Sequence, residues 1–232
     1  MDVQSQETAI RIGDVDYSVD VSKIPYLSHF VSFQRTAKPG SSEFVHDEIP
    51  LFDVALKGVE SGYRHCFRSL PADLSQTRTL CETYEFLCVD VLGGKPITAI
   101  IDGLKAGKTD YELEYKRYIP VKGNKSKARD MALVLVYLIL LGEFTDEAKD
   151  TARIYNAVLF VVSHSGTFKW KTRKIVRAAY EDRFVVSSKQ MATLDKWNKE
   201  AVEEGDDVTT EEEDHDDYYG SDGYDGYDEY DS

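Results

Sequence analysis

The first segment of the chain with a chemically suggestive pattern is "GLKAGKT", residues 103–109. A phosphate-binding P-loop reads GxxxxGK[ST], whereas this segment has only three residues between its glycines. One residue fewer prevents the backbone N–H groups from wrapping a phosphate before the lysine reaches it. We therefore expect a helix end here, and a nucleotide-binding enzyme using Lys108 and Thr109 is the remote alternative.

Histidine and cysteine residues give no pattern typical of catalysis or metal binding. His65 and Cys66 are adjacent, but a catalytic dyad needs a base within reach and a third group that orients it. The remaining residues of these types lack the tight paired spacing of a zinc site: His46, Cys81 and Cys88. We expect no catalytic residue, no metal and no cofactor. The three cysteines, which form no CxxC pair, are expected to be buried free thiols.

Positive charge gathers between residues 169 and 177, next to the aromatic residues Phe168 and Trp170. Clustered Lys and Arg bind phosphates, and nearby aromatic rings can stack on bases. The predicted polyanion contact consists of Lys169, Lys171, Arg173, Lys174 and Arg177. A solvated helix face is the more common explanation of such a run.

The negative charge of the chain lies mainly at its C-terminal end. The net charge is −14, yet 15 of the 42 acidic residues fall within 203–232, which has no Lys or Arg. The preceding 202 residues therefore contain 27 acidic and 28 basic residues and are nearly neutral. This balance makes nucleic acid an unlikely partner overall. Residues 203–232, rich in Asp, Glu, Gly and Tyr, are predicted to be a disordered acidic tail.

No segment of the sequence resembles a signal peptide or a membrane span. The longest apolar run, Met131 to Leu141, is shorter than the ~20 residues that cross a bilayer. We expect no membrane association and a location in the cytoplasm, the nucleus or both.

The elements that would position these residues begin with a β-hairpin. Apolar and polar residues alternate on both sides of Gly13-Asp14, a pair suited to a two-residue turn. This turn predicts a register with three facing pairs: Ile12 and Val15, Ile10 and Tyr17, Thr8 and Val19. A helix should follow, with Ser22 as its N-cap and Pro25 in its first turn. Its apolar residues at helical spacing are Ile24, Leu27, Phe30 and Val31.

Two longer helices are predicted after a loop at 35–44 and a short strand within 44–50. The first spans 51–70, where Gly58 and Gly62 indicate weakening, close packing or a break. The second extends to Val91 and is closed by Gly93-Gly94.

This order of elements resembles that of a BTB/POZ domain. The similarity lies in "IRIGDVDYSVDVSKIPYLSHF", "IPLFDVALKGV" and "TLCETYEFLCVDVL", and covers residues 7–94. The wording "DEIPLFDVALKGVESGYRHCFRSLP" is most similar to uncharacterised fungal BTB proteins. Two features depart from the family: the first helix carries an aromatic variant of the usual pattern, and 35–48 lacks long strands.

The resemblance implies a protein-interaction module without catalytic activity. Many BTB proteins recruit a cullin scaffold of a ubiquitin ligase, and others are oligomerising parts of transcription regulators. The first helix, with Ile24, Leu27, Phe30 and Val31, would be the seam of a homodimer. The partner face would include Leu51, Phe52, Lys57, Tyr63 and Arg64. The alternative is a nucleic-acid-associated transcription regulator that uses the basic helix 169–177.

The rest of the chain is predicted to be helical. Apolar spacing indicates helices at 97–104, 125–142, 146–164, about 168–182 and 188–202, with an extended segment or linker at 109–121. The sequence thus predicts an α+β fold in three parts: a BTB/POZ-like small sheet with helices (1–94), an all-helical region (95–202) and the acidic tail (203–232).

Overall fold

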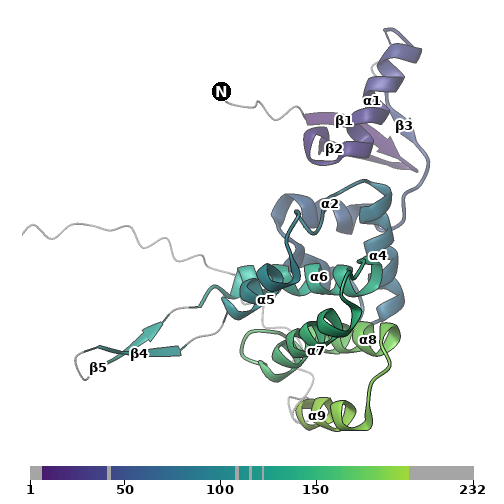
Figure 1. Ribbon diagram of the computed structural model, residues 1–232. Helices are drawn as coiled ribbons and strands as arrows, with labels where there is room; N and C mark the ends of the chain where they lie inside the picture. Colours follow the sequence, from purple (N-terminus) through teal and green to yellow (C-terminus); the bar gives the residue numbers. More distant parts are fainter. Residues whose placement is uncertain (1–6, 41–42, 108–109, 115–116, 122, 199–232) are drawn as a thin grey trace, which may run out of the picture.

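The computed structural model describes residues 7–40, 43–107, 110–114, 117–121 and 123–198. The predicted tail at 203–232, as well as Lys108 and Thr109, lies outside these residues. The described chain forms an elongated stack, with a small sheet at one end and α9 at the other (Figure 1). The fold is mixed α+β, as the sequence predicts.

The small sheet begins with the predicted hairpin. Strands β1 (Glu7–Ile12) and β2 (Val15–Asp20) are antiparallel, and all three predicted residue pairs are confirmed. Gly13 adopts φ +58 in the turn, a value that glycine tolerates well. Strand β3 (Val45–His46) then pairs in parallel with β1, giving the order β2-β1-β3. The buried face of this sheet includes Ile10, Ile12 and Val19.

The prediction that Ser22 caps the first α-helix is wrong, because Ser22 lies in a separate short helix before it. A short 3₁₀ helix, η1 (Val21–Lys23), precedes α1 (Pro25–Ala37). The carboxylate of Asp20 caps η1 by accepting hydrogen bonds from the Ser22 N–H at 3.2 Å and hydroxyl at 2.6 Å. Ser22 therefore donates to a cap, and α1 begins at Pro25, whose fixed φ suits a first helical turn.

The helix predicted at 51–70 is interrupted at Gly62, where the backbone has φ 99. It consists of α2 (Phe52–Ser61), η2 (Tyr63–His65) and α3 (Cys66–Ser69). Gly58 marks close packing, because a Cβ there would collide with the Tyr84 hydroxyl and lie 2.9 Å from the Cys66 sulfur. The two glycines thus have different roles.

The next helix, α4 (Leu74–Phe86), is shorter than predicted. The chain leaves the helix at Cys88, which adopts a left-handed conformation with φ 55. As a result Cys88 is exposed, which corrects the prediction that all three thiols are buried. Cys66 and Cys81 are buried free thiols, as predicted.

The second half of the chain is helical apart from one hairpin. Its helices lie close to the predicted ranges: α5 (Ile97–Lys105), α6 (Lys125–Leu141), α7 (Glu147–Ser163), α8 (Trp170–Arg183) and α9 (Ser188–Asn198). Between α5 and α6, strands β4 (Asp110–Glu114) and β5 (Arg117–Val121) form an antiparallel pair that extends away from the stack (Figure 1). This hairpin departs from the predicted all-helical region and agrees with the extended alternative predicted for 109–121.

Helix α6 lies at the centre of the hydrophobic core. It packs against α5, α8, η2 and α4. One continuous cluster of buried residues extends from Ile10 in the sheet to Leu194 in α9. The boundary predicted at residue 94 therefore separates two stretches of sequence that share one core.

The helices described here are all too short or too polar to cross a lipid bilayer. Even α6, with nine buried residues, has only 17 residues and begins with charged ones.

Candidate functional site

Three of the four residues predicted as a dimer seam are buried inside the chain's own core. Ile24, Leu27 and Val31 have exposed fractions of 1%, 0% and 2%. Because they belong to the chain's own hydrophobic core, they offer no surface to a partner. Phe30, the fourth, is partly buried.

A different set of aromatic residues lies on the outer side of α1. Tyr26, Phe30 and Phe33 follow one another at spacings of four and three residues, which places them on one helical face. Phe33 is 68% exposed. We call this surface the α1 aromatic face and define it by Tyr26, Phe30, Phe33, His46 and Phe86.

Contacts within the α1 aromatic face hold most of its rings in place. The Tyr26 ring lies 4.6 Å from the Phe86 ring, and the Phe30 ring lies 5.0 Å from the His46 ring, centroid to centroid. Nδ1 of His46 is 2.7 Å from the Asp47 carbonyl oxygen, which can only accept, so Nδ1 carries a proton. In the neutral ring, Nε2 of His46 then accepts a hydrogen bond from the Tyr26 hydroxyl at 2.7 Å.

The predicted partner face on α2 and η2 is only partly exposed. Phe52 is buried and packs edge-on against Tyr17, with ring centroids 4.9 Å apart. Leu51 and Tyr63 are half-buried, and burial raises the pKa of Tyr63 to about 12. Lys57 is exposed. The surface predicted from these residues thus reduces largely to Lys57.

Arg64, also predicted as a partner contact, joins two parts of the chain. Its backbone N–H donates to Oδ1 of Asp130 at 2.7 Å, and its Nη1 lies 3.3 Å from Oδ2 of the same carboxylate. Since Asp130 belongs to α6, this pair holds η2 against the central helix.

The predicted polyanion contact does not form one face. Its five residues lie on different sides of α8. Arg173 is only 5% exposed, and Lys171 donates to the Leu70 carbonyl oxygen at 2.8 Å. Lys174 is exposed and its ammonium lies 5.0 Å from the Trp170 ring centroid, a cation–π contact.

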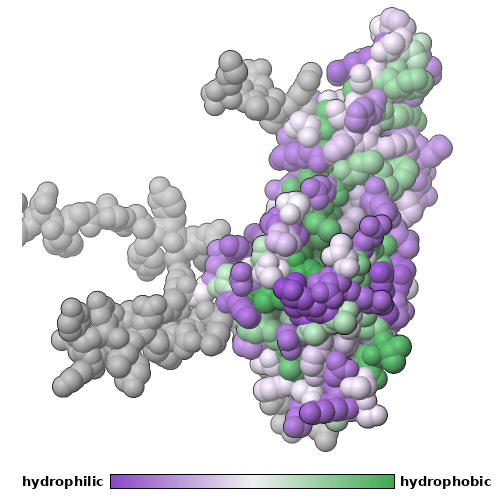
Figure 2. Space-filling model, in the orientation of Figure 1, coloured by the Kyte–Doolittle hydropathy of each residue, from purple (hydrophilic) through white to green (hydrophobic). Residues whose placement is uncertain are grey.

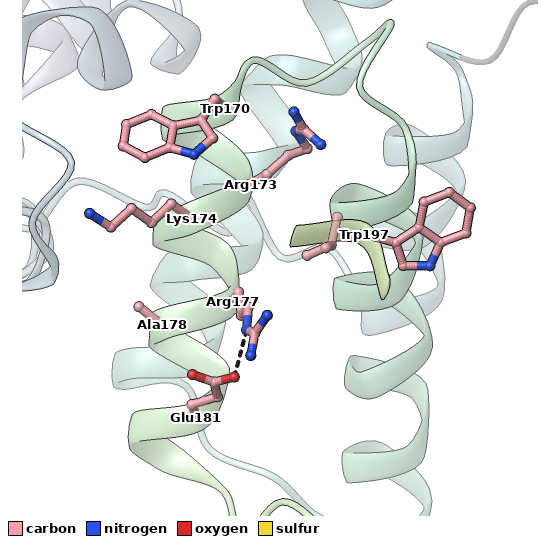
Figure 3. Close-up of a pocket in the computed structure, with 8 residues that line it drawn as sticks. Trp170, Arg173, Lys174, Arg177, Ala178, Glu181 and Trp197 are labelled. Atoms are coloured by element: carbon pink, nitrogen blue, oxygen red, sulfur yellow. Dashed lines mark hydrogen bonds and ion pairs between the residues drawn. The ribbon is translucent and has the colours of Figure 1, made fainter. Parts of the chain in front are cut away.

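One side of α8 forms a pocket of about 270 Å³ with α7 and α9, which we call the α8–α9 pocket. Figure 3 shows Trp170, Lys174 and Arg177 along α8, and Trp197 on α9. Its lining includes Trp170, Arg173, Lys174, Arg177, Glu181 and Trp197. Nε of Arg177 donates to Glu181 at 2.6 Å, and its Nη2 donates to Asp195 at 2.7 Å. Two carboxylates of the same chain therefore neutralise Arg177.

Another side of α8 carries the remaining two predicted residues. Lys169 and Lys171 line a second pocket of about 160 Å³, which we call the α3–α8 pocket. Arg64 and Arg68 complete its wall from the first half of the chain, and Arg129 does so from α6. Sequence reasoning missed this combination because its members lie far apart in the chain and no local pattern joins them.

The His65-Cys66 pair has no catalytic geometry. Burial raises the pKa of the Cys66 thiol to about 11, so the group is protonated at neutral pH and is a poor nucleophile. Its sulfur lies 3.3 Å from the Tyr84 hydroxyl in the core. Among the residues that the structure describes, no three His, Cys, Asp or Glu side chains are grouped closely enough to hold a metal ion.

Comparison with known proteins adds no relative: no protein-family model, curated protein or solved structure matches this chain.

Proposed function

We propose that this chain is a protein-interaction module that self-associates through the α1 aromatic face. The observation that carries the proposal is the exposure of Phe33, on the same helical face as Tyr26 and Phe30. Phe86, 47% exposed, extends this surface onto the end of α4. Hydrophobic surface, green in Figure 2, interrupts the polar surface at the end of the molecule that carries α1. Aromatic residues are enriched at the centres of protein interfaces.

A second copy of the chain is the partner that this surface fits best. Two identical helix faces can meet across a two-fold axis, which brings each aromatic ring against aromatic rings of the other copy. Most of the rings are already fixed by contacts within the chain, so dimerisation would cost little side-chain entropy. Phe33 would supply the largest newly buried surface.

The resemblance of residues 7–94 to BTB/POZ domains supports the same function. Members of that family self-associate, and their first helix is a natural dimer seam. On the basis of this resemblance we also propose a more specific role, in which the chain recruits a cullin scaffold and presents a substrate for ubiquitination. Lys57, exposed on α2, is the predicted partner-face residue best placed to contact such a scaffold.

Light scattering of the full-length chain tests self-association. We expect a dimer, and we expect Phe33→Asp to yield a monomer because it places a charge in the apolar interface. Ser32→Asp is the matched control, since it adds the same charge at an exposed position on another face of α1. A monomeric wild-type chain, or a dimer that Phe33→Asp leaves intact, would refute this proposal.

The finer proposal needs a separate measurement. The full-length chain is mixed with the N-terminal domain of the cullin that partners BTB proteins, and the mixture is separated by size. Co-elution that Lys57→Glu weakens would support cullin recruitment. A dimer that never co-elutes would leave self-association standing and exclude the ligase role.

A further inference from the structure

The α3–α8 pocket gathers positive charge from four separate elements. Its lining includes Arg64 of η2, Arg68 of α3, Arg129 of α6, and Lys169 and Lys171 at the start of α8. No acidic side chain lines it, whereas the α8–α9 pocket contains Glu181. Asp130 already pairs with Arg64 from outside this lining. An anion in the pocket of about 160 Å³ would further reduce the repulsion among the cations that line it.

Three of these cations are anchored in a way that leaves donors available. Arg129 uses Nε to donate to the Thr167 carbonyl oxygen at 2.9 Å, and Lys171 uses its ammonium to donate to Leu70. A guanidinium has five N–H donors and an ammonium has three, so each retains others. Arg64 is anchored through Nη1, which lies 3.3 Å from Oδ2 of Asp130, while its Nε is buried without a hydrogen-bond partner among the described residues. The side chains are therefore held in position before any ligand arrives.

The pocket also receives the N-terminus of α8, a helix of 14 residues. Its N-cap, Lys169, makes no side-chain capping hydrogen bond, and the N–H groups of the first turn have no acceptor within the helix. The residues of this turn that line the pocket include Lys171 and Thr172. Because the positive end of the helix dipole adds to the basic side chains, the pocket favours a compact, multiply charged anion.

The same cations lower the pKa of the neighbouring His65. Burial lowers its pKa most, and the positive charges of Arg64, Arg68 and Lys57 lower it further. Asp130 opposes them as a weaker influence. His65 is thus harder to protonate mainly because it is partly buried, and Arg64 and Arg68 of the pocket add to this effect.

We propose that the α3–α8 pocket is a binding site for a phosphate group. Arginine forks and free helical N–H groups match the geometry of phosphate oxygens, and lysines supply additional charge. The pocket joins the first half of the chain to α6 and α8, so a bound phosphate also holds these elements together. This site is separate from the α1 aromatic face and does not depend on dimerisation.

Calorimetric titration of the full-length chain with inorganic phosphate tests the site, with chloride used to keep the ionic strength constant. We expect saturable binding of one phosphate per chain. The variant with both Arg68→Ala and Lys169→Ala should lose about tenfold or more in affinity, since each contact to a charged group contributes substantially. Lys174→Ala is the matched control, because Lys174 lies on the same helix but lines the other pocket. It should leave the affinity unchanged.

Two results would overturn the proposal: phosphate that binds no more tightly than chloride, or an equal loss of affinity in Lys174→Ala. Adenosine monophosphate and phosphoserine then distinguish the source of the phosphate. Tighter binding of either one than of inorganic phosphate identifies an attached phosphate as the ligand, and tighter binding of inorganic phosphate identifies the free ion. In every case the binding must be lost in the double variant and retained in Phe33→Asp.

Discussion

Helices α1 and α8 each carry residues that the sequence marks as functional, and the fold treats the two sets differently. On α1, the predicted aliphatic residues turn inward, and an aromatic stripe remains outside. On α8, the predicted cations divide between two pockets, one lined in part by Glu181 and one lined by cations without acidic residues. The comparison shows that residue type defines what a side chain can bind, whereas its neighbours decide whether it is available.

The two helices differ in what keeps their predicted functional side chains from contacting a partner. The inner residues of α1 are buried in the hydrophobic core, among apolar side chains. On α8, Arg177 is covered by Glu181 and Asp195, which supply opposite charge. A residue buried in the apolar core becomes accessible only when the chain unfolds. The carboxylates that pair with Arg177 can instead be removed by substitution. The predictions below use this difference.

The largest expected effect is a difference in the free energy of unfolding between substitutions on the inner and the outer face of α1. Leu27→Ala should lower the free energy of unfolding by about 3 kcal/mol, because it removes fully buried methyl groups and leaves a cavity. Phe33→Ala, an exposed position, should change it by less than about 0.5 kcal/mol. Urea denaturation of dilute protein measures both. Similar losses for the two variants would mean that α1 has no distinct outer face.

A smaller loss of stability is expected when the α8–α9 pocket, like the α3–α8 pocket, is left without acidic side chains. Glu181→Gln combined with Asp195→Asn removes the charges that neutralise Arg177, and should cost roughly 1–3 kcal/mol of stability through the loss of charged hydrogen bonds. The same variant should gain a second, weaker phosphate site in a calorimetric titration. Adding Arg177→Met should abolish that second site. A stoichiometry that stays at one would show that the α8–α9 pocket lacks a suitable geometry even when its charge is released.

The smallest expected effect concerns His65, beside the α3–α8 pocket. Its pKa in the folded chain is lower than the usual 6.5, so the unfolded chain binds the proton more readily. This residue should therefore reduce stability as the pH falls below about 6.5, and His65→Gln should remove that part of the pH dependence. Phosphate in the pocket should raise the pKa of His65 by offsetting Arg64 and Arg68. An NMR titration of the ring, with and without phosphate, measures the change; a pKa indifferent to phosphate would contradict the placement of the ligand.

Local structure was largely predictable where neighbouring residues decide it. The hairpin register followed from the Gly13-Asp14 turn and the alternation of Ile10 and Ile12. The cores of α5 to α8 followed from apolar spacing. The end of α4 was missed, because the periodic pattern continues to Val91 whereas the backbone turns at Cys88. For 109–121 the sequence left an extended segment and a linker open, and the structure shows two strands there; only their pairing was not predicted.

The candidate sites were less predictable for a geometrical reason. An apolar stripe at helical spacing shows that a helix face will be covered, but α1 has two such stripes, one aliphatic and one aromatic. Burial of the aliphatic stripe in the hydrophobic core decided which one remained outside. The role expected of Leu27 and Val31 was therefore assigned to the wrong face.

The sequence by itself determined the elements: the hairpin, most helices, the near-neutral body and the charge on α8. Only the tertiary structure decided which charges meet, because Coulomb interactions depend on distance in space and not along the chain. Arg64 and Lys169 are about a hundred residues apart in the sequence, yet both line the α3–α8 pocket. Arg177 and Asp195 belong to consecutive helices, and the turn between them brings the carboxylate to 2.7 Å from the guanidinium. Their different surroundings make one group of cations a phosphate site and the other an internal ion pair.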